Sequence, residues 1–414
     1  MQRPRIDAGR FLARFEELGA IGATPDGMQR IAFSPAEVRA REWVTRGLES
    51  AGFRVRTDAC ANLIGTRPGS DPGALPLTVG SHVDAVPLGG KYDGALGVVA
   101  ALEAATALRE SGRTTRHPWE VLVFTNEEGA RFHRGLMGSR SMAGLLEAGD
   151  LSVRDEDGRT LADHLPSVGG DATRLGDAAT NKRRVAGYFE LHIEQGPILF
   201  EEGIQLGIVT GITGRAAATV TVQGFANHAG TTPMERRRDA GAAGARIALA
   251  VRDVAARERL CRVGTVGIAR LHPGAINVIP GGCTLEVEFR DLQDHAVAAA
   301  LRRLAEHAAA IAAEERVRVE IEVADRESGT PTDPRFRGFL SRAAGALGYS
   351  HKDVQSGASH DAQSMAHLGP MGMLFVPSVN GVSHAVGEFT PPEDCVRGAE
   401  VLLEALLLAD AELA

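Results

Sequence analysis

The sequence predicts an α/β protein in which a smaller domain is inserted into a larger one. In the first half of the chain, apolar strands alternate with helices, as expected when a mostly parallel sheet is covered on both faces. Around residue 214 the pattern changes to strands with one apolar face, and the first pattern resumes after residue 327. We therefore expect a larger domain from residues 1–213 and 328–414, and an inserted domain from residues 214–327. The length of 414 residues suits two or three domains.

A helix near the start of the larger domain is marked by its first residues. Ser34 can cap it, Pro35 suits its first turn and Glu37 can complete a capping box, and we expect it to end near Gly52. Strands are then predicted at residues 53–57, 62–67, 75–80, 119–125 and 186–193, with an alanine-rich helix at residues 95–109. Open sheets of this kind bind their ligands beyond the carboxyl ends of the strands.

The inserted domain is predicted from the order of its elements. Strands are expected at residues 216–223, 264–271, 283–290 and 317–323, and helices at residues 236–257 and 294–315. The resulting order, strand–helix–strand–strand–helix–strand (βαββαβ), is typical of a ferredoxin-like domain. The basic run Arg236-Arg237-Arg238 is interpreted as the solvated start of the first helix rather than as a phosphate site.

The composition excludes several classes of function. The formal net charge is −8 and aromatic residues make up 5% of the chain, so neither nucleic-acid binding nor carbohydrate stacking is expected. The four cysteines form no C-x-x-C pair, which is typical of a reducing cytoplasm. No apolar signal segment follows Met1, and no run of about 18 apolar residues occurs, so we expect neither secretion nor a membrane span.

Histidine and carboxylate side chains recur at the predicted ends of strands. Each follows an apolar strand or lies in a glycine-rich turn, and such positions can converge at one edge of a sheet. The candidates are His82, Asp84, Asp93, Glu127, Glu128, His192 and His384. All are residue types that serve metal sites. A single histidine is usually a surface or core residue, so the prediction of a metal site depends on the shared setting of the whole group.

Two of these positions have simpler interpretations. Asp93, in the turn Gly89-Gly90-Lys91-Tyr92-Asp93-Gly94, can merely cap the following helix. Capping does not explain why this turn follows the strand end His82-Val83-Asp84 so closely. Glu127 and Glu128 can belong to an ordinary solvated loop. If the strand geometry continues, they instead point in different directions, so that one binds metal and the other faces the reacting water.

Five segments resemble those of the hydantoinase/carbamoylase group of amidases, which are related to the M20 metallopeptidases. They are GSHVDAVPLGGKYDGALGV, VFTNEEGARF, ELHIEQGPIL, NHAGTTPM and GVSHAVGEF, and they occur in order over nearly the whole chain. The group includes N-carbamoyl-L-amino acid hydrolases, allantoate amidohydrolases and β-ureidopropionases. The resemblance implies an M20-type catalytic domain with two divalent metal ions per subunit, an inserted lid that forms a homodimer, and hydrolysis of ureido C–N bonds.

The resemblance also implies a role for each candidate ligand. His82 and His192 resemble the ligands of one metal, Glu128 and His384 resemble those of the other, and Asp93 resembles the bridging carboxylate. Because the set contains imidazoles and carboxylates but no thiolate, it accommodates zinc, manganese, cobalt or nickel.

Three further residues receive catalytic roles from the resemblance. Glu127 resembles the general base that takes a proton from water and passes it to the leaving nitrogen. Asp84 resembles the carboxylate that orients His82. His228, in the lid segment NHAG, resembles a histidine that reaches the active site of the partner subunit and stabilises the developing oxyanion.

Candidate substrate contacts come from both domains. Asn277 and Arg290 match the pair that anchors the substrate carboxylate, although Arg290 can also be read as a surface cation. Gln195 follows His192 by three residues and is expected to line the pocket. His360 matches a loop near the substrate, or else forms a hydrogen bond within its own loop.

Arg215 is the main departure from the resemblance. Allantoate amidohydrolases tend to carry glutamine at the matching position and carbamoylases an apolar residue, whereas this chain has arginine. Its charge favours a second substrate carboxylate, or else the residue lies on the surface. Two other segments favour different groups: LHPGAINVIP resembles the carbamoylases, and FVPSVNGVSH resembles the allantoate enzymes.

These observations lead to one principal hypothesis. The chain is predicted to be a cytoplasmic, homodimeric, metal-dependent amidase that converts N-carbamoyl-L-amino acids to amino acid, CO2 and ammonia. The alternatives are an allantoate amidohydrolase or another ureide hydrolase, then a peptidase with the same metal core, and then a catalytically silent metal-binding or scaffolding protein. Glu127 beside all five ligands argues against a silent protein, which need not keep the base.

Overall fold

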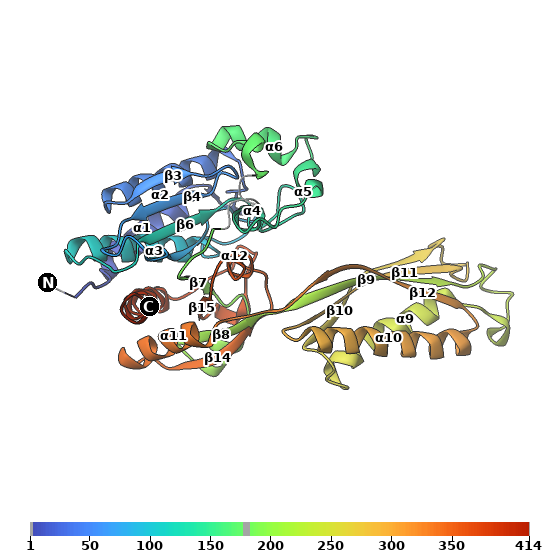
Figure 1. Cartoon of the computed structure of the whole chain (residues 1–414). Coiled ribbons are helices and arrows are strands. Elements are labelled where there is room, and N and C mark those ends of the chain that lie inside the picture. Colours follow the sequence, from blue (N-terminus) through green and yellow to red (C-terminus); the bar gives the residue numbers. More distant parts are fainter. Residues whose placement is uncertain (1–2, 177–182, 414) are drawn as a thin grey trace. The chain divides into compact units, whose positions relative to one another are not determined.

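The chain forms two compact units in the computed structural model, which describes residues 3–176 and 183–413. Unit 1 consists of Met1–Thr210 and Thr332–Ala414, and unit 2 consists of Gly211–Pro331. The sequence of unit 2 therefore interrupts that of unit 1, and its limits lie within four residues of the predicted ones. Figure 1 shows the helices and strands of each unit.

Unit 1 is built on a mixed sheet whose centre is parallel. Among the described residues, eight strands of this sheet begin in unit 1, in the order β8-β15-β7-β5-β6-β4-β3, with β14 paired to β8. The strands are β3 (Arg54–Thr57), β4 (Leu63–Arg67), β5 (Leu77–His82), β6 (Trp119–Phe124), β7 (Gly187–Ile193), β8 (Leu206–Ile212), β14 (His351–Ser356) and β15 (Met371–Val376). Because β15, β7, β5 and β6 run parallel, their carboxyl ends share one edge.

Helices pack on both faces of this sheet. The α-helices in the described part of unit 1 are α1 (Ala8–Ala20), α2 (Pro35–Ser50), α3 (Ala95–Glu110), α4 (Met137–Met142), α5 (Ala148–Ser152), α6 (Leu161–His164), α8 (Ile198–Glu202), α11 (Pro334–Ala346), α12 (Asp361–Met365) and α13 (Pro392–Glu412). Leu191 in β7 lies against Gly398 of α13. The adjacent Glu190 points to the other face and accepts a hydrogen bond from the Ala362 N–H of α12. The predicted α/β layering is confirmed.

The start of α2 largely follows the prediction. Ser34 Oγ accepts a hydrogen bond from the Glu37 backbone N–H (3.2 Å), and Pro35 opens the first turn. The Glu37 side chain, however, accepts from the backbone N–H of Phe33 rather than that of Ser34, so the capping box is not completed. The chain leaves the helix through Gly52, whose φ is 81°.

The described part of the segment between β6 and β7 contains three short α-helices that the sequence analysis did not predict. α4, α5 and α6 surround a small apolar core that includes Phe33, Phe132, Met137 and Leu161. Helices this short bury too few side chains to show a 3.6-residue period, so the sequence pattern does not reveal them.

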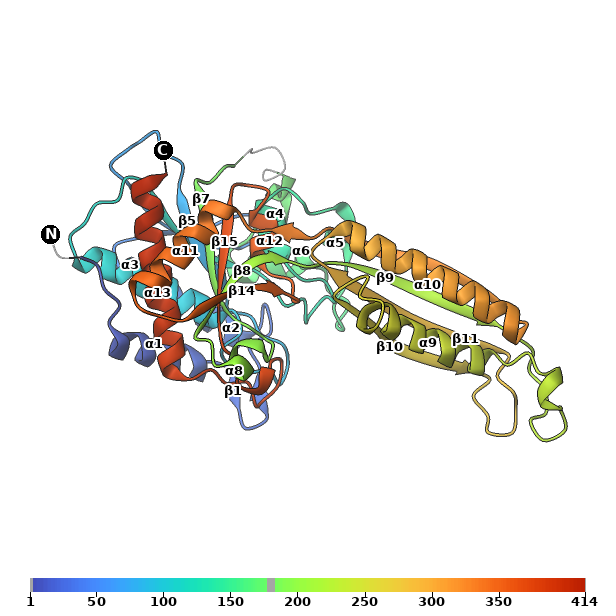
Figure 2. The same cartoon turned by 90° about the horizontal axis from the view of Figure 1, so that it is seen from below.

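Unit 2 has the predicted order of elements. It contains β9 (Gly214–Gln223), α9 (Ala240–Ala256), β10 (Val263–His272), β11 (Gly282–Asp291), α10 (Asp294–Glu315) and β12 (Arg318–Glu327). The strands form an antiparallel sheet in the order β10-β11-β9-β12, and α9 and α10 pack side by side (Figure 2). The helix start predicted at Arg236 is wrong, because Asp239 caps α9 by accepting from the Gly241 and Ala242 N–H groups. None of the described helices is long and apolar enough to cross a membrane.

Candidate metal centre

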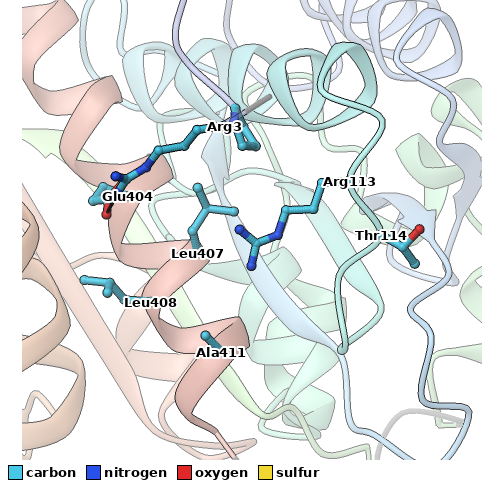
Figure 3. A pocket seen from close by; sticks show the side chains of 8 residues that line it. Arg3, Arg113, Thr114, Glu404, Leu407, Leu408 and Ala411 are labelled. Carbon is cyan, nitrogen blue, oxygen red and sulfur yellow. Dashed lines mark hydrogen bonds and ion pairs between the residues drawn. The ribbon is translucent and has the colours of Figure 1, made fainter. Parts of the chain in front are cut away.

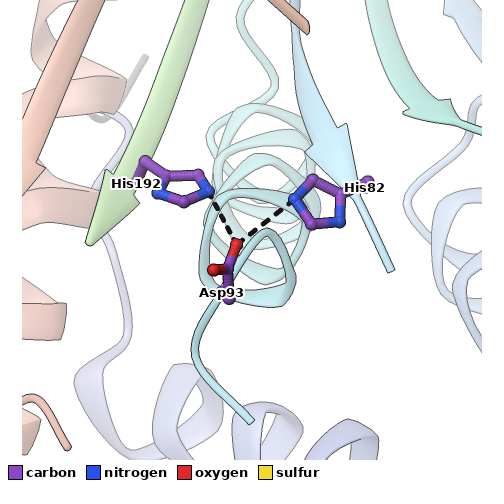
Figure 4. Close-up of side chains that lie close together, drawn as sticks. All are labelled: His82, Asp93 and His192. Carbon is purple, nitrogen blue, oxygen red and sulfur yellow. Dashed lines mark ion pairs between the residues drawn. The ribbon is translucent and has the colours of Figure 1, made fainter. Parts of the chain in front are cut away.

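Five predicted ligands meet at the carboxyl edge of the parallel strands in unit 1. His82 ends β5, His192 lies near the end of β7, and Asp93 stands in the turn before α3 (Figure 4). Glu128 follows β6 and His384 follows β15. Parallel pairing of the strands explains why residues so distant in sequence are neighbours in space.

Asp93 is the central carboxylate of this group. Its Oδ1 atom lies 3.4 Å from His82 Nε2 and 3.1 Å from His192 Nε2. Its Oδ2 atom lies 3.2 Å from His384 Nε2. The two oxygens of one carboxylate thus face two separate sets of ligands. The simpler interpretation of Asp93 as a helix cap is wrong, since the N-cap of α3 is Gly94 and no side chain caps the helix.

Gly94 shapes the turn that presents Asp93. Its φ is 61°, a value that L side chains rarely adopt. A Cβ atom at this position would also lie 2.4 Å from the His82 ring. Only glycine therefore lets the turn pass so close to the histidine.

Glu127 and Glu128 point to different sides of the centre. Glu128 Oε2 lies 3.4 Å from His384 Nε2, and its Oε1 atom is buried without a hydrogen-bond partner. Glu127 Oε2 lies 3.5 Å from His82 Nε2. Glu127 contacts a histidine of the first ligand set and Glu128 one of the second, although ligand atoms of His82, Glu127 and Glu128 also lie within 4.8 Å of one another. Neither acid belongs to an ordinary solvated loop.

The two strand histidines are oriented by backbone carbonyl groups. His82 Nδ1 donates to the carbonyl oxygen of Asp84 (3.0 Å), and His192 Nδ1 donates to that of Ile193 (2.9 Å). A carbonyl can only accept, so the proton of each neutral ring is on Nδ1. Each Nε2 lone pair then faces Asp93, as metal ligation requires.

Asp84 holds the glutamate pair as well as the first histidine. Its Oδ1 and Oδ2 atoms accept hydrogen bonds from the backbone N–H groups of Glu127 and Glu128, each at 3.2 Å. The shortest contact between its carboxylate and His82 Nδ1 is 3.7 Å, longer than the bond made by its carbonyl oxygen. Asp84 therefore orients His82 through its backbone, and its side chain positions the turn that carries the two glutamates.

Arg30 is a supporting residue that the sequence analysis missed. Its guanidinium is buried and donates to the carbonyl oxygens of Val83 (2.6 Å), Leu18 (2.7 Å) and Ile21 (2.9 Å). These bonds tie α1 to the strand end that carries His82. No motif could have revealed this role, because the partners lie in segments far from Arg30 and offer only backbone atoms.

Burial and imidazole–carboxylate contacts set the proton affinities of the centre. Burial raises the pKa of Asp93, but the rings of His192, His384 and His82 outweigh this effect and hold the pKa well below its usual range. Burial raises the pKa of Glu128 to about 8, and contact with Asp93 raises the pKa of His384 to about 9. Protons balance the negative charge here, a role that divalent cations can take over.

The described side chains fit two divalent cations. Ligand atoms of His82, Asp93 and His192 lie within 4.8 Å of one another, and so do those of Asp93, Glu128 and His384. The unpartnered Oε1 atom of Glu128 supports the fit, because a buried carboxylate oxygen is costly unless it is paired.

Gln195 and His360 both adjoin the centre. Gln195 Nε2 donates to Asp93 Oδ2 (2.6 Å) and lies 3.3 Å from His384 Nε2. His360 is buried, and its Nε2 atom forms a hydrogen bond with Ser356 Oγ (2.8 Å). The loop hydrogen bond considered for His360 is therefore present.

Another group of candidate ligands shares His192 with the centre. Glu190, His192 and His360 also bring ligand atoms within 4.8 Å of one another. The carboxylate of Glu190, however, already accepts hydrogen bonds from Ser81 Oγ (2.7 Å) and Tyr188 OH (3.1 Å). This carboxylate is satisfied without a cation, so we assign no metal to the group.

Unit 2 holds the remaining candidates at two opposite ends of its sheet. His228 pairs with Val278 in a β-bridge, and the Ala229 N–H donates to the carbonyl oxygen of Asn277 (2.9 Å), so His228 and Asn277 lie together at one end. Both are exposed. Arg290 lies at the other end, eight strand residues from the start of β11, or about 27 Å at the usual rise of a strand. Asn277 and Arg290 of one chain are therefore too far apart to grip the same carboxylate.

Arg290 and Arg215 are cross-strand neighbours in this sheet. They are paired in the register of β11 and β9. Arg290 Nε lies 2.6 Å from Glu288 Oε1, whereas Arg215 Nη2 donates to Asp325 Oδ2 (2.9 Å) and Glu327 Oε1 (3.0 Å). Two carboxylates of its own unit therefore balance the charge of Arg215 in an ion-pair network, and its contact with a second substrate carboxylate stays a prediction.

A surface pocket elsewhere in unit 1 lacks the chemistry of this centre. Apolar residues of α13 line it together with Arg113 and Glu404, and Glu404 pairs with Arg3 (Figure 3). Arg113 precedes β6, so the pocket lies toward the amino end of that strand. The ligand group is at the opposite edge.

The family assignment rests on the segment that carries the ligands. Residues 78–408, which include all five candidate ligands, match the family described as peptidase family M20/M25/M40. The chain belongs to this family. Its members typically bind divalent metals, in agreement with the ligand groups of unit 1.

Known relatives match almost the whole chain. A protein named N-carbamoyl-L-amino acid amidohydrolase from Geobacillus stearothermophilus is 42% identical, covering 96% of this chain and 97% of that protein. A protein named ureidoglycolate hydrolase from Arabidopsis thaliana is 37% identical, covering 96% and 85%. The structure of an amidase of the hydantoinase/carbamoylase family from Burkholderia multivorans is 36% identical, with a TM-score of 0.91, covering 99% and 100%. The resemblance inferred from five sequence segments is confirmed.

Proposed function

We propose that the chain hydrolyses N-carbamoyl-L-amino acids to amino acid, CO2 and ammonia, with two divalent metal ions held in unit 1. The observation that carries the proposal is the position of Asp93, whose two oxygens face separate ligand sets beside Glu127. Relatives named N-carbamoyl-L-amino acid amidohydrolase, at 36–42% identity, support the choice of substrate.

The ligand roles in this proposal follow the two sets of contacts. His82 and His192 would hold one cation, Glu128 and His384 would hold the other, and Asp93, whose oxygens face both sets, would be shared between them. Bound there, zinc, manganese or a similar cation would supply Lewis-acid polarisation of the scissile carbonyl and would make water more acidic. A ureido carbonyl needs such activation, because both of its nitrogens donate electron density to it.

Glu127 is proposed as the general base. Its carboxylate stands beside His82, and its backbone N–H is held by Asp84, so the side chain has a defined place at the edge of the ligand group. Burial raises the pKa of Glu127 well above its usual range. A carboxylate with this proton affinity can take a proton from water and deliver it to the leaving nitrogen.

His228 is proposed to stabilise the oxyanion in the active site of a partner subunit. Its Nδ1 atom accepts a hydrogen bond from the Gly230 N–H (3.0 Å), so the proton of the neutral ring is on Nε2. The exposed ring therefore offers an N–H donor, as an oxyanion site requires.

The separation within unit 2 supports a homodimer. His228 and Asn277 lie at one end of the sheet and Arg290 at the other, so one small substrate can meet all three only if they come from two chains. We propose that the chains associate through unit 2 and that Arg290 of one subunit and Asn277 of the other anchor the substrate carboxylate. We also propose a cytoplasmic location, which the four unpaired, buried cysteines support.

The test is ammonia release by the metal-loaded chain from a panel of ureides. N-carbamoyl-L-amino acids should give the highest kcat/KM, with the D enantiomers as matched controls. Dipeptides, followed by release of free amino acid because their hydrolysis yields no ammonia, are the test of peptidase activity. Allantoate and ureidoglycolate test the second candidate, which is kept because a relative named ureidoglycolate hydrolase matches 96% of the chain. A higher kcat/KM for either of these ureides would replace the proposed substrate.

A further inference from the structure

We propose that Glu388 is a positioning residue that sets the distance between Asp93 and His384 and thereby the affinity for the second cation. The inference rests on the proposed metal centre but not on the identity of the substrate. It concerns a side chain that is buried beside the centre, although it is not one of the candidate ligands.

The carboxylate of Glu388 joins two turns that are far apart in sequence. Its Oε1 atom accepts hydrogen bonds from the backbone N–H groups of Tyr92 (2.9 Å) and Asp93 (3.2 Å). Its Oε2 atom accepts from Ser383 Oγ (3.0 Å) and from the backbone N–H of His384 (3.3 Å). One side chain thus holds the backbone of the bridging aspartate and that of the most exposed ligand.

His384 needs this support more than the other histidine ligands. His82 and His192 lie on strands of the sheet and are almost fully buried. His384 lies in a loop, about half of its side chain is exposed, and its φ is 54°. A residue other than glycine in this backbone region is strained unless its surroundings hold it there. The bond from its N–H to Glu388 supplies such a restraint.

Gly90 provides the space that Glu388 occupies. A Cβ atom at Gly90 would lie 2.3 Å from Glu388 Oε1 and 2.4 Å from its Cβ. Gly90 is not among the glycines with positive φ, so its backbone tolerates alanine and the obstacle is Glu388 itself. The Gly90→Ala change therefore disturbs the same clamp without altering any of its hydrogen-bonding groups.

The test uses the full, metal-free chain titrated with Co2+ alone, followed by visible absorption and by equilibrium dialysis. The wild-type chain should take up two Co2+ ions. Glu388→Gln replaces an acceptor oxygen with an N–H2 group, so we expect the second ion to bind about 10- to 100-fold more weakly. The first ion and its absorption spectrum should be nearly unchanged. Glu393→Gln, the same chemical change at an exposed position nearby, is the matched control.

Gly90→Ala should reproduce the selective loss, and adding Glu388→Gln to it should cause little further loss, because both changes act on one clamp. Two tightly bound Co2+ ions in both single variants would overturn the inference, as would equal weakening of both ions. If Glu388→Gln fails to fold, Gly90→Ala decides. A wild-type chain that binds fewer than two ions would overturn both the metal centre and the inference. Two bound ions without ureide hydrolysis would overturn the proposed function alone.

Discussion

Mixing two inactive variants tests whether the active site is shared between subunits. His228→Ala removes the proposed oxyanion donor, and Glu127→Gln removes the proposed base. Each variant alone should be nearly inactive, although folded and metal-loaded. In a mixed dimer, one of the two sites combines Glu127 of one chain with His228 of the other, so activity should return.

The expected recovery follows from the geometry of unit 2 and from dimer statistics. Because about 27 Å of strand separates the His228 end from Arg290, His228 and Arg290 of one chain cannot contact one small substrate. After complete exchange of equal amounts, about half of the dimers are mixed, and one of their two sites is intact. We therefore expect about one quarter of the wild-type turnover per chain.

The assay is ammonia release from an N-carbamoyl-L-amino acid after subunit exchange, with exchange verified by differently tagged chains. A mixture of Glu127→Gln and Glu128→Gln is the matched control. Both of those lesions lie in unit 1, so neither site of the mixed dimer is intact and no activity should return. Verified exchange without recovery in the His228 mixture would mean that His228 acts within its own chain or not at all. An active wild-type monomer would lead to the same conclusion.

Four variants, measured singly, test individual residues. Glu127→Gln should keep its metal but lose about 100-fold or more in turnover, as expected for a lost general base. Glu128→Gln should instead lose metal, and the opposite result from elemental analysis would reverse the two roles. Arg290→Ala should cost carboxylate-bearing ureides about 10- to 150-fold in kcat/KM, the loss of one charge-assisted bond. Equal losses for uncharged ureides would make Arg290 structural. Arg30→Met removes the guanidinium donor from three carbonyl groups, of which that of Leu18 keeps a bond from the Ile21 N–H, and should lower the free energy of unfolding by about 3–5 kcal/mol. A urea midpoint close to that of the wild type would contradict this role.

The ligand group was predictable because it depends on local patterns that converge. Apolar runs mark β5, β6 and β7, and parallel strands bring their carboxyl ends together wherever the helices lie. His82, Glu128 and His192 could therefore be placed at one edge without knowledge of the tertiary structure.

The supporting contacts were not predictable, because they join segments that the sequence does not relate. The Asp84 carboxylate accepts hydrogen bonds from backbone N–H groups that follow β6. Arg30 donates to a carbonyl group of α1 and to one just after the end of β5. Glu388 lies within GVSHAVGEF, one of the five segments that carry the resemblance. Its partner at Tyr92, however, is a backbone N–H group. Backbone partners leave no mark in a sequence, since every residue offers them.

The large distance between Asn277 and Arg290 within one chain could have been predicted from the sequence. The two residues are close in the chain, and the resemblance pairs them at one substrate carboxylate. Residues 283–290 were nevertheless expected to form a strand, and an extended strand places its ends far apart. The predicted strand and the predicted pair are compatible only if the two residues act from different subunits.

The central claim is that hydrolysis depends on two divalent cations held by the histidine and carboxylate group of unit 1. The most direct test measures metal content and turnover of an N-carbamoyl-L-amino acid on the same samples. Chelation should abolish turnover, and returning a divalent cation to the metal-free chain should restore it, with a plateau at two ions per chain. Full turnover by protein that elemental analysis shows to be free of metal would contradict the claim.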